Sequence, residues 1–167
     1  MASEFFDVVN AADEVIGRQP RAEVHRLGLL HRAVHVLVFN SRGQVYLQKR
    51  AHTKDRQPGL WDSSASGHVD AGEDYDTAAL RELREELGIA AGAPLARLFK
   101  VPACPETDNE FVWVYKCVHD GPVAPDPREI ECGGWYWPAA VTRWMAERPH
   151  EFATAFRLIW ARIAEQT

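Results

Sequence analysis

Residues 67–89 read GHVDAGEDYDTAALRELREELGI, and this segment decides the fold. Its second half, Tyr75–Leu87, has the apolar spacing of an amphipathic helix, and Gly88 is a typical C-cap. At about 100° per residue, one apolar stripe forms from Ala79, Leu80, Leu83 and Leu87. The opposite side is predicted to carry Glu82, Glu85 and Glu86. The segment therefore predicts a strand, a loop and a helix with clustered carboxylates.

The clustered carboxylates have two interpretations. One is a solvated charged face with an ion pair between Arg81 and Glu85. The other is a cation site, because Glu82 and Glu86 are like charges at i, i+4 and destabilise a helix slightly on their own. Hard divalent ions such as Mg²⁺ or Mn²⁺ bind oxygen ligands of this kind. The helix alone leaves both interpretations open.

Length and composition favour one globular domain over residues 1–167. A hydrophobic content of 46% with 26% charged residues argues against disorder. The longest apolar run, Ala33–Phe39, is far shorter than the roughly 20 residues of a membrane span. The first residues are acidic and lack the basic region of a signal peptide. We therefore expect a cytoplasmic protein that does not enter a membrane.

The charge limits the partners that the protein can have. A net charge of −5 makes polymeric nucleic acid a poor candidate, because affinity for it comes from a basic surface. A small-molecule diphosphate stays possible, since a metal ion can supply positive charge locally. The three cysteines include no C-x-x-C pair, which predicts reduced thiols and excludes a zinc ribbon. The oligomeric state stays open.

The segments on either side predict a domain of the α/β class in three parts. Residues 1–30 form a hairpin and lead-in, residues 31–137 the core, and residues 138–167 the C-terminal helices. The predicted strands are Phe5–Asn10, Glu14–Gly17, His31–Phe39, Gln44–Lys49, Trp61–Val69, Leu95–Val101, Glu110–Val118 and Trp135–Trp137. Besides Tyr75–Leu87, helices are predicted within Arg21–Leu30, from Pro138, and from Pro149 to about Glu165.

Residues 67–89 also match the pattern G-x5-E-x7-R-E-U-x-E-E-x-G-U, with U aliphatic, at every specified position. The matching residues are Gly67, Glu73, Arg81, Glu82, Leu83, Glu85, Glu86, Gly88 and Ile89. With average residue usage, a chance match at one start position is on the order of 10⁻⁹. The segment resembles the Nudix box. The resemblance implies a Nudix α/β/α sandwich with a mixed β-sheet, and metal-dependent cleavage of a diphosphate linked to another moiety.

The resemblance also implies roles for the box residues. The metal ligands would be Glu82, Glu85 and Glu86, with the carbonyl of Gly67 as a further ligand to Mg²⁺ or Mn²⁺. Arg81 would orient the glutamates, and Glu73 would hold Arg81 or add a water-mediated contact to the metal. Glu85 and Glu86 are candidate general bases, because a glutamate can position or deprotonate the attacking water. Which of the two acts is not determined.

Residues 29–137 loosely resemble the isopentenyl-diphosphate isomerase branch of the Nudix superfamily. In that branch two histidines and two acids bind a divalent metal, and the matching positions are His31, His68, Asp108 and Glu110. Glu110 is also a candidate catalytic acid. His25 would be a fifth ligand, out of register with the pattern. Arg50 and Lys54 match the residues that grip the substrate diphosphate.

One residue departs from the isomerase pattern. The isomerases have a cysteine directly before the box glycine, and this chain has Ser66, a far weaker acid–base group at neutral pH. The complete Nudix box is what a hydrolase requires. We therefore expect hydrolysis of a diphosphate linkage in a nucleoside diphosphate derivative or a similar small molecule. Isomerisation of isopentenyl diphosphate and diphosphate binding without catalysis are the alternatives.

Two further sets of residues are weaker candidates. Glu129 and Glu131 are predicted in the loop before Trp135, where several Nudix hydrolases place a catalytic base. Four aromatic side chains that could stack a nucleobase are Trp113, Tyr115, Trp135 and Trp137. A solvated loop and a hydrophobic core are the simpler interpretations of these two sets.

Overall fold

The computed structural model describes residues 3–90 and 95–166. The strands are β1 (Phe5–Val9), β2 (Val15–Pro20), β3 (His31–Phe39), β4 (Val45–Arg50), β5 (Trp61–Asp62), β6 (Ala65–His68), β7 (Ala96–Val101), β8 (Glu110–Val118) and β9 (Ile130–Tyr136). The helices are α1 (Arg21–Leu27), α2 (Tyr75–Leu87), α3 (Pro138–Glu147) and α4 (Thr154–Glu165), with 3₁₀ turns η1 (Pro105–Thr107) and η2 (Pro149–Glu151). The predicted segment boundaries coincide with the starts of β3 and α3, whereas the organisation as a single domain stays a prediction.

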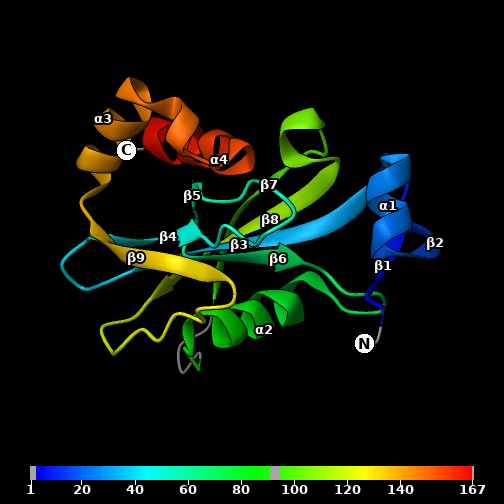
Figure 1. Cartoon of the computed structure of the whole chain (residues 1–167), viewed down its shortest axis with the longest axis horizontal. Helices are drawn as coiled ribbons and strands as arrows, with labels where there is room; N and C mark the ends of the chain where they lie inside the picture. Colours follow the sequence, from blue (N-terminus) through cyan, green and yellow to red (C-terminus); the bar gives the residue numbers. More distant parts are fainter. Residues whose placement is uncertain (1–2, 91–94, 167) are drawn as a thin grey trace.

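The central sheet is mixed. Its strand order is β5-β4-β3-β8-β7, with β6 on β3 and β9 on β4, and β3 and β8 are parallel. Helix α2 covers one face, and α3 and α4 cover the other (Figure 1). Strands β1 and β2 pair with each other and lie with α1 at one end of the sheet (Figure 1). The predicted α/β sandwich with a mixed sheet and a C-terminal helix is confirmed.

Strand β3 forms the middle of the sheet because its apolar and β-branched run can be buried on both faces. Among the described residues, β3 and β4 pair only at Phe39 and Val45, beside the hairpin loop. Beyond that point the two strands diverge, and β6 pairs with the first half of β3. The divergence places β6 beside the strand that carries His31 and His35.

Three predicted strands were wrong in extent. Strand β2 ends at Pro20 instead of Gly17. Trp61–Val69 is not one strand but two, because Ser64 turns the chain from β4 to β3: its hydroxyl donates to the Tyr46 carbonyl at 2.5 Å and accepts from the Val38 N–H at 2.8 Å. β9 begins at Ile130 instead of Trp135. Gly133 conceals this extension in the sequence, since glycine is a poor strand former. A Cβ at that position would lie 2.2 Å from the Tyr46 hydroxyl oxygen.

Helix α2 has the predicted ends. The Asp74 carboxylate accepts the Thr77 N–H at 2.7 Å, and Gly88 ends the helix at φ 65°. The predicted apolar stripe needs one correction, because Leu80 is 46% exposed. Glu86, expected on the opposite side, is instead buried among the core residues. It lies only about 20° from Ala79 around the helix axis, at the centre of the buried face.

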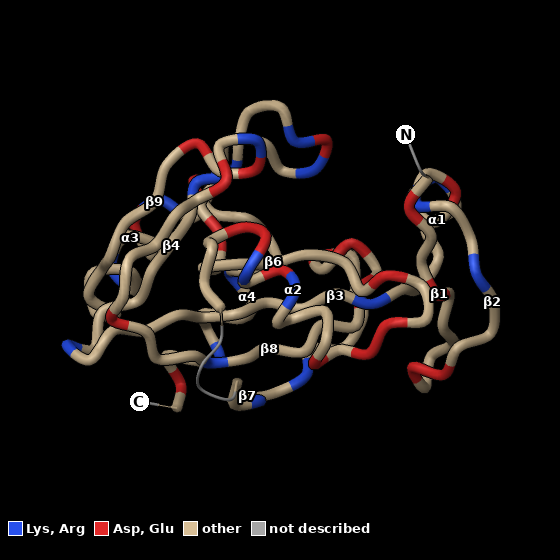
Figure 2. Tube along the Cα trace, turned by 90° about the horizontal axis from the view of Figure 1, so that it is seen from below, with Lys and Arg blue, Asp and Glu red and all other residues tan. Residues whose placement is uncertain are grey.

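The C-terminal region differs from the prediction at one point. Pro149 begins the short turn η2, and the final helix starts only at Thr154. Between them the chain is extended, because Phe152 bridges to Trp61 and the Ala153 N–H donates to the Trp61 carbonyl at 2.9 Å. No helix in the described part of the chain has both the length and the apolar character of a membrane span. Lys and Arg residues are interspersed with Asp and Glu along the trace (Figure 2).

The N-terminal hairpin is fastened to the core by a buried carboxylate. Asp13, in the turn between β1 and β2, accepts hydrogen bonds from Arg32 and Tyr75, both at 2.7 Å, and from Lys100. Only 7% of the Asp13 side chain is exposed. The hairpin therefore has a defined position against the sheet and α2. The contacts of the hairpin therefore also fix the position of α1, because α1 follows β2 directly.

Candidate active site

A cavity of about 1000 Å³ is lined by side chains from β3, β6, α2, β8 and the loop at residues 51–60. Two sets of candidate ligands meet there. The glutamate group consists of Glu82, Glu85 and Glu86, together with the Gly67 carbonyl. The histidine group consists of His25, His31, His68, Asp108 and Glu110. The predicted ligands line this cavity except His25 and His31, whose ring nitrogens lie within 4.8 Å of one of the cavity-lining His68. Arg50, Lys54 and Arg81 line the same cavity.

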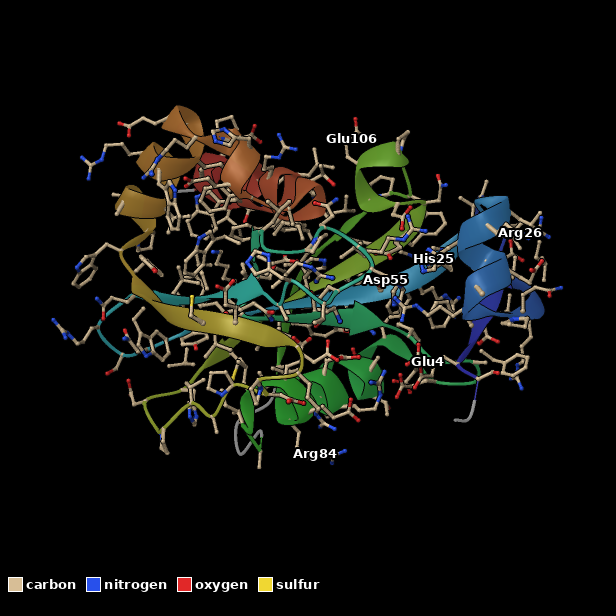
Figure 3. The ribbon with its side chains drawn as sticks, viewed as in Figure 1. Glu4, His25, Arg26, Asp55, Arg84 and Glu106 are labelled. Atoms are coloured by element: carbon tan, nitrogen blue, oxygen red, sulfur yellow. The ribbon has the colours of Figure 1, made fainter. Side chains whose placement is uncertain are left out.

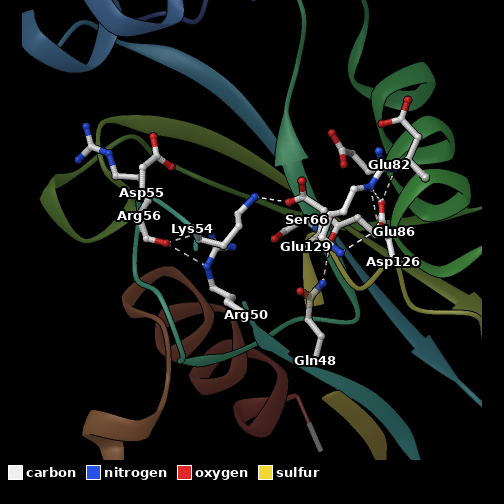
Figure 4. A network of polar contacts seen from close by, with 12 residues as sticks. Gln48, Arg50, Lys54, Asp55, Arg56, Ser66, Glu82, Glu86, Asp126 and Glu129 are labelled. Atoms are coloured by element: carbon white, nitrogen blue, oxygen red, sulfur yellow. Dashed lines mark hydrogen bonds and ion pairs between the residues drawn. The ribbon is translucent and has the colours of Figure 1, made fainter. Parts of the chain in front are cut away.

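Tertiary contacts hold two of the three glutamates in place. Glu86 accepts a hydrogen bond from the Gln48 side-chain amide at 2.8 Å and one from the Ser66 N–H at 3.0 Å (Figure 4). Glu82 packs directly on Gly67, where a Cβ would lie 2.2 Å from the Glu82 carboxyl group. A glycine is therefore required beside the carboxylate. Glu85 is the accessible member of the group, with 55% of its side chain exposed.

Arg81 links the glutamates to the loop before the helix. Its guanidinium donates to both carboxylate oxygens of Glu73 at 2.9 Å and to the His68 carbonyl at 3.0 Å. It also donates to Glu82 at 2.7 Å and to Glu85 at 3.3 Å. The hydrogen bonds from Arg81 to Glu73 raise the pKa of Arg81 further. These contacts are the ones that the predicted orienting role requires.

The glutamate group fits a divalent cation. Burial raises the pKa of Glu86, and the nearby charge of Glu82 raises it further. Burial also raises the pKa of Glu82, in spite of the opposing charge of Arg81. Two buried carboxylates this close hold protons strongly unless a cation neutralises them. Carboxylate and carbonyl oxygens are the ligands that Mg²⁺ and Mn²⁺ prefer.

The histidine group is assembled from separate elements. His25 projects from α1 toward the sheet, away from the side on which Arg26 lies (Figure 3). One ring nitrogen of each of His25, His31 and His68 lies within 4.8 Å of those of the other two. Glu110 lies 2.9 Å from His68 Nε2 and 3.4 Å from His31 Nε2, and Asp108 lies 3.3 Å from His25 Nδ1. His25 therefore joins the group although its sequence position is out of register.

The ring nitrogens of the histidine group also fit a metal ion. His31 Nδ1 lies 2.8 Å from the Leu29 carbonyl, which fixes the proton on Nδ1 and leaves Nε2 as a ligand atom. Within the described chain, the buried Nε2 atoms of all three rings have no hydrogen bond of regular geometry. Such buried groups are costly without a partner. A divalent cation bound by imidazole and carboxylate, such as Mn²⁺ or Zn²⁺, would satisfy them.

The pKa shifts of this group agree with metal binding. Burial lowers the pKa of His25 to about 4, and the neighbouring His68 contributes in the same direction. Burial alone would raise the pKa of Glu110, but the charge of His68 and the closeness of the His31 and His68 rings hold it well below its usual range. A neutral imidazole and an ionised carboxylate are the protonation states that bind metals.

The two predicted diphosphate-binding residues lie on one side of the cavity. Arg50 donates to the Arg56 carbonyl at 2.9 and 3.1 Å and lies 3.4 Å from Asp62, and Lys54 pairs with Glu129 (Figure 4). Both cations are thus held near the glutamate group. Arg50 is bound by a carbonyl and by a carboxylate that lines the cavity, and Lys54 by a carboxylate. Phosphate oxygens can replace these partners.

The weaker candidates differ in their position relative to the cavity. Glu129 lines the cavity, whereas Glu131 lies in β9 and not in a loop, and it pairs with Lys49 and His52 away from the cavity. None of the four aromatic side chains, Trp113, Tyr115, Trp135 and Trp137, is among the described residues that line the cavity. Of these, Tyr115 is in the core, as the simpler interpretation had it.

Two residues at the site had no signal in the sequence. Gln48 reaches Glu86 from β4, 38 positions earlier in the chain. Phe6, from β1, stacks on His68 with 4.5 Å between ring centroids and lies parallel to His31 at 5.7 Å. The Phe6 ring therefore closes one side of the histidine group. Neither residue belongs to a motif, so only their place in the fold identifies them.

Comparisons with known proteins agree with this geometry. A model of the NUDIX domain matches residues 29–156. The chain is 34% identical to a protein of Serratia proteamaculans named isopentenyl-diphosphate Delta-isomerase, over 96% of this chain and 98% of the relative. It is 36% identical to the uncharacterized Nudix hydrolase YfcD of Escherichia coli, over 84% of this chain and 78% of the relative.

A solved structure extends the likeness to the fold. The crystal structure of DR0079 from Deinococcus radiodurans superposes with a TM-score of 0.76 at 32% identity, covering 86% of this chain and 90% of that protein. The match to the NUDIX domain covers most of the chain, and relatives over nearly its whole length bear both the hydrolase and the isomerase names. The chain therefore belongs to the NUDIX family, in its isopentenyl-diphosphate isomerase-like branch.

Proposed function

We propose that this protein hydrolyses a diphosphate linkage in a small molecule, a nucleoside diphosphate derivative or a similar compound, and requires Mg²⁺ or Mn²⁺. One observation carries the proposal. A single cavity holds the complete glutamate group and, beside it, the cations Arg50 and Lys54. The carboxylates suit a divalent ion, and the cations suit phosphate oxygens. Membership of a family that includes Nudix hydrolases supports the reaction type.

Each residue has a defined part in this reaction. The glutamate group would hold a divalent ion, which would supply positive charge to the diphosphate and polarise its phosphorus–oxygen bonds. Arg81 keeps Glu82 and Glu85 in position. Arg50 and Lys54 donate hydrogen bonds to the diphosphate oxygens. Glu85 and Glu86 are the candidates for the base that accepts a proton from the attacking water.

A second candidate function has its own supporting observation. The three histidine rings lie close enough to hold one metal ion, the resemblance to the isomerases assigns a metal to His31 and His68, and several relatives are named isopentenyl-diphosphate isomerases. In that reaction Glu110 would exchange a proton with the substrate. Ser66 argues against it, because the hydroxyl cannot replace a thiol as acid–base group at neutral pH. Hydrolysis is therefore the first proposal.

A chromatographic screen for monophosphate and phosphate products tests both candidates. The substrates are nucleoside diphosphates and triphosphates, nucleotide sugars, dinucleotides and isopentenyl diphosphate, each with Mg²⁺ and with Mn²⁺. Glu86→Gln serves as the inactive comparison, and Arg84→Gln, on the exposed side of the same helix, as the matched control. Turnover that Glu86→Gln abolishes and Arg84→Gln retains supports the hydrolase. An allylic product from isopentenyl diphosphate, without phosphate release, would replace it by the isomerase.

A further inference from the structure

One pair of polar side chains in the cavity has no part in the reaction as described so far. His35 on β3 and Ser66 on β6 are directly opposite each other in an antiparallel ladder. Their side chains therefore lie on the same face of the sheet, with Cβ atoms about 5 Å apart. Both residues line the cavity. The pair stands at the inner wall, where a bound molecule would reach the sheet.

The contacts of His35 leave one ring nitrogen for a ligand. Its Nδ1 lies 2.8 Å from the Ser63 hydroxyl and 3.7 Å from the Asp62 carboxylate. That carboxylate favours the proton on Nδ1, so that Nε2 is the acceptor. Burial lowers the pKa of His35, which keeps the ring neutral. In the part of the chain that the structure describes, neither His35 Nε2 nor the Ser66 hydroxyl has a hydrogen-bond partner.

The pair lies between the residues that would hold the diphosphate. The Ser66 N–H donates to Glu86 at 3.0 Å. On the other side, Asp62 beside His35 lies 3.4 Å from Arg50. A diphosphate held by Arg50 and by a cation at Glu86 would therefore present the moiety attached to it to His35 and Ser66.

The chemistry of this wall selects among such moieties. We infer that His35 and Ser66 recognise a hydroxyl group on the moiety attached to the diphosphate, which makes sugar- or ribose-linked diphosphates better substrates than prenyl diphosphates. A hydroxyl can donate to Nε2 and accept from the Ser66 hydroxyl at once. A prenyl chain would leave both groups unpaired, and sites built to pair with a polar group reject analogues that lack it strongly. The inference rests on the proposed function.

The test compares substrates that differ only in hydroxyl groups. Adenosine and uridine diphosphate are measured against their 2′,3′-dideoxy forms, with Mn²⁺, for turnover and for direct binding by calorimetry. We expect the wild type to prefer the hydroxylated form by about fivefold for each of the two hydrogen bonds, since one neutral hydrogen bond contributes about 1 kcal/mol. In Ser66→Ala and His35→Phe the preference should fall toward one, through KM more than kcat. Isopentenyl diphosphate should compete poorly with the hydroxylated forms.

Three controls make the result specific. Ser41→Ala, in the exposed loop between β3 and β4, should retain the full preference. Ser66→Thr keeps the hydroxyl and should restore most of what Ser66→Ala loses. Thermal unfolding of each variant shows whether it is folded, and His35→Gln replaces His35→Phe if the larger ring disrupts the core.

The outcomes separate the two proposals. An equal preference in the wild type and both variants, or no preference at all in the wild type, would overturn the inference while hydrolysis could stand. The wild type could bind the hydroxylated forms more tightly than the dideoxy forms and turn over neither. If both variants lost that difference in binding, the result would support the recognition by His35 and Ser66 and overturn the hydrolase. Loss of discrimination together with retained turnover of the dideoxy forms is the expected result.

Discussion

The glutamate group and the histidine group reach the same cavity by different routes. The three glutamates lie within five consecutive residues of one helix, 82–86, so that the local geometry of α2 brings them together. The histidine group takes one residue each from α1, β3 and β6, Asp108 from the turn before β8, and Glu110 from the first position of β8. Its geometry therefore depends on the packing of four elements.

The difference shows in what each group needs from the rest of the fold. The glutamate group needs three neighbours: Gly67 for space, Arg81 for orientation and Gln48 as a donor to Glu86. The histidine group needs the whole N-terminal hairpin, because α1 carries His25 and Phe6 closes one side. A locally defined site tolerates displacement of distant elements, and a site shared among elements does not. Four measurements test this difference between the two groups.

The largest effect is expected from Glu86→Gln. We expect kcat/KM for the best substrate to fall by about a thousandfold, because the amide can neither accept a proton nor neutralise a cation. His31→Gln should lower the same constant by less than about tenfold, if the histidine group only supports binding. The measurement is steady-state phosphate release with Mg²⁺. Equal losses in both variants would mean that the two groups act as one centre.

A pair of leucines on α2 tests what supports the glutamate group. Leu83 is fully buried and Leu80 is 46% exposed. We expect Leu83→Ala to lower the free energy of unfolding by about 3 kcal/mol, through lost packing and a cavity. Leu80→Ala should change it by less than about 0.5 kcal/mol. Urea unfolding measures both. Equal losses in the free energy of unfolding would mean that Leu80 packs in the core, as the sequence predicts.

Metal affinity should separate the two groups. We expect His68→Gln to weaken binding of Zn²⁺ or Mn²⁺ at the histidine group by about thirtyfold, since ligand and supporting residues commonly contribute tenfold to a hundredfold. His150→Gln, on an exposed turn, is the matched control and should change nothing. Competition with a chelator gives the affinities. An unchanged affinity in His68→Gln would remove the histidine group from consideration as a metal site.

The smallest effect is a difference in pH dependence of the metal-free protein. Burial raises the pKa of Glu86 to about 8, so its contribution to stability is lost as the pH rises from about 5 to 8. The pKa of His25 is lowered to about 4, so its contribution is lost as the pH falls from about 6.5 to 4. Compared with Glu86→Gln, the free energy of unfolding of the wild type should fall as the pH rises. Compared with His25→Gln, it should fall as the pH decreases.

Each of these slopes can reach about 1.4 kcal/mol per pH unit for one proton. Unfolding in the presence of a chelator, from pH 4 to 8.5, measures them. Slopes of the same sign in the two comparisons would contradict the contrast between the groups. Addition of Mn²⁺ should flatten the Glu86 slope, because the cation replaces the proton.

Much of the local structure could be predicted. The ends of α2, β3 and β8 coincide with their predicted ends, because the capping residues, Gly88 and the β-branched run are signals within a few residues of the element that they define. The predictions were wrong where a neighbouring strand or side chain determines the structure. β9 contains two glycines and is a strand only because β4 lies beside it, and the donors to the buried Glu86 carboxylate are Gln48 and Ser66, which belong to other strands.

The sequence by itself determined the Nudix family, the helix with its glutamates and the residues that could bind a diphosphate, because these depend on spacing along one element or one motif. Only the tertiary structure decided which donors bind the Glu86 carboxylate, that His25 joins the histidine group, and that His35 faces Ser66. These facts depend on strand register and on the packing of α1 against the sheet. Contacts between residues far apart in the chain form only when the whole core closes, and no local pattern encodes them.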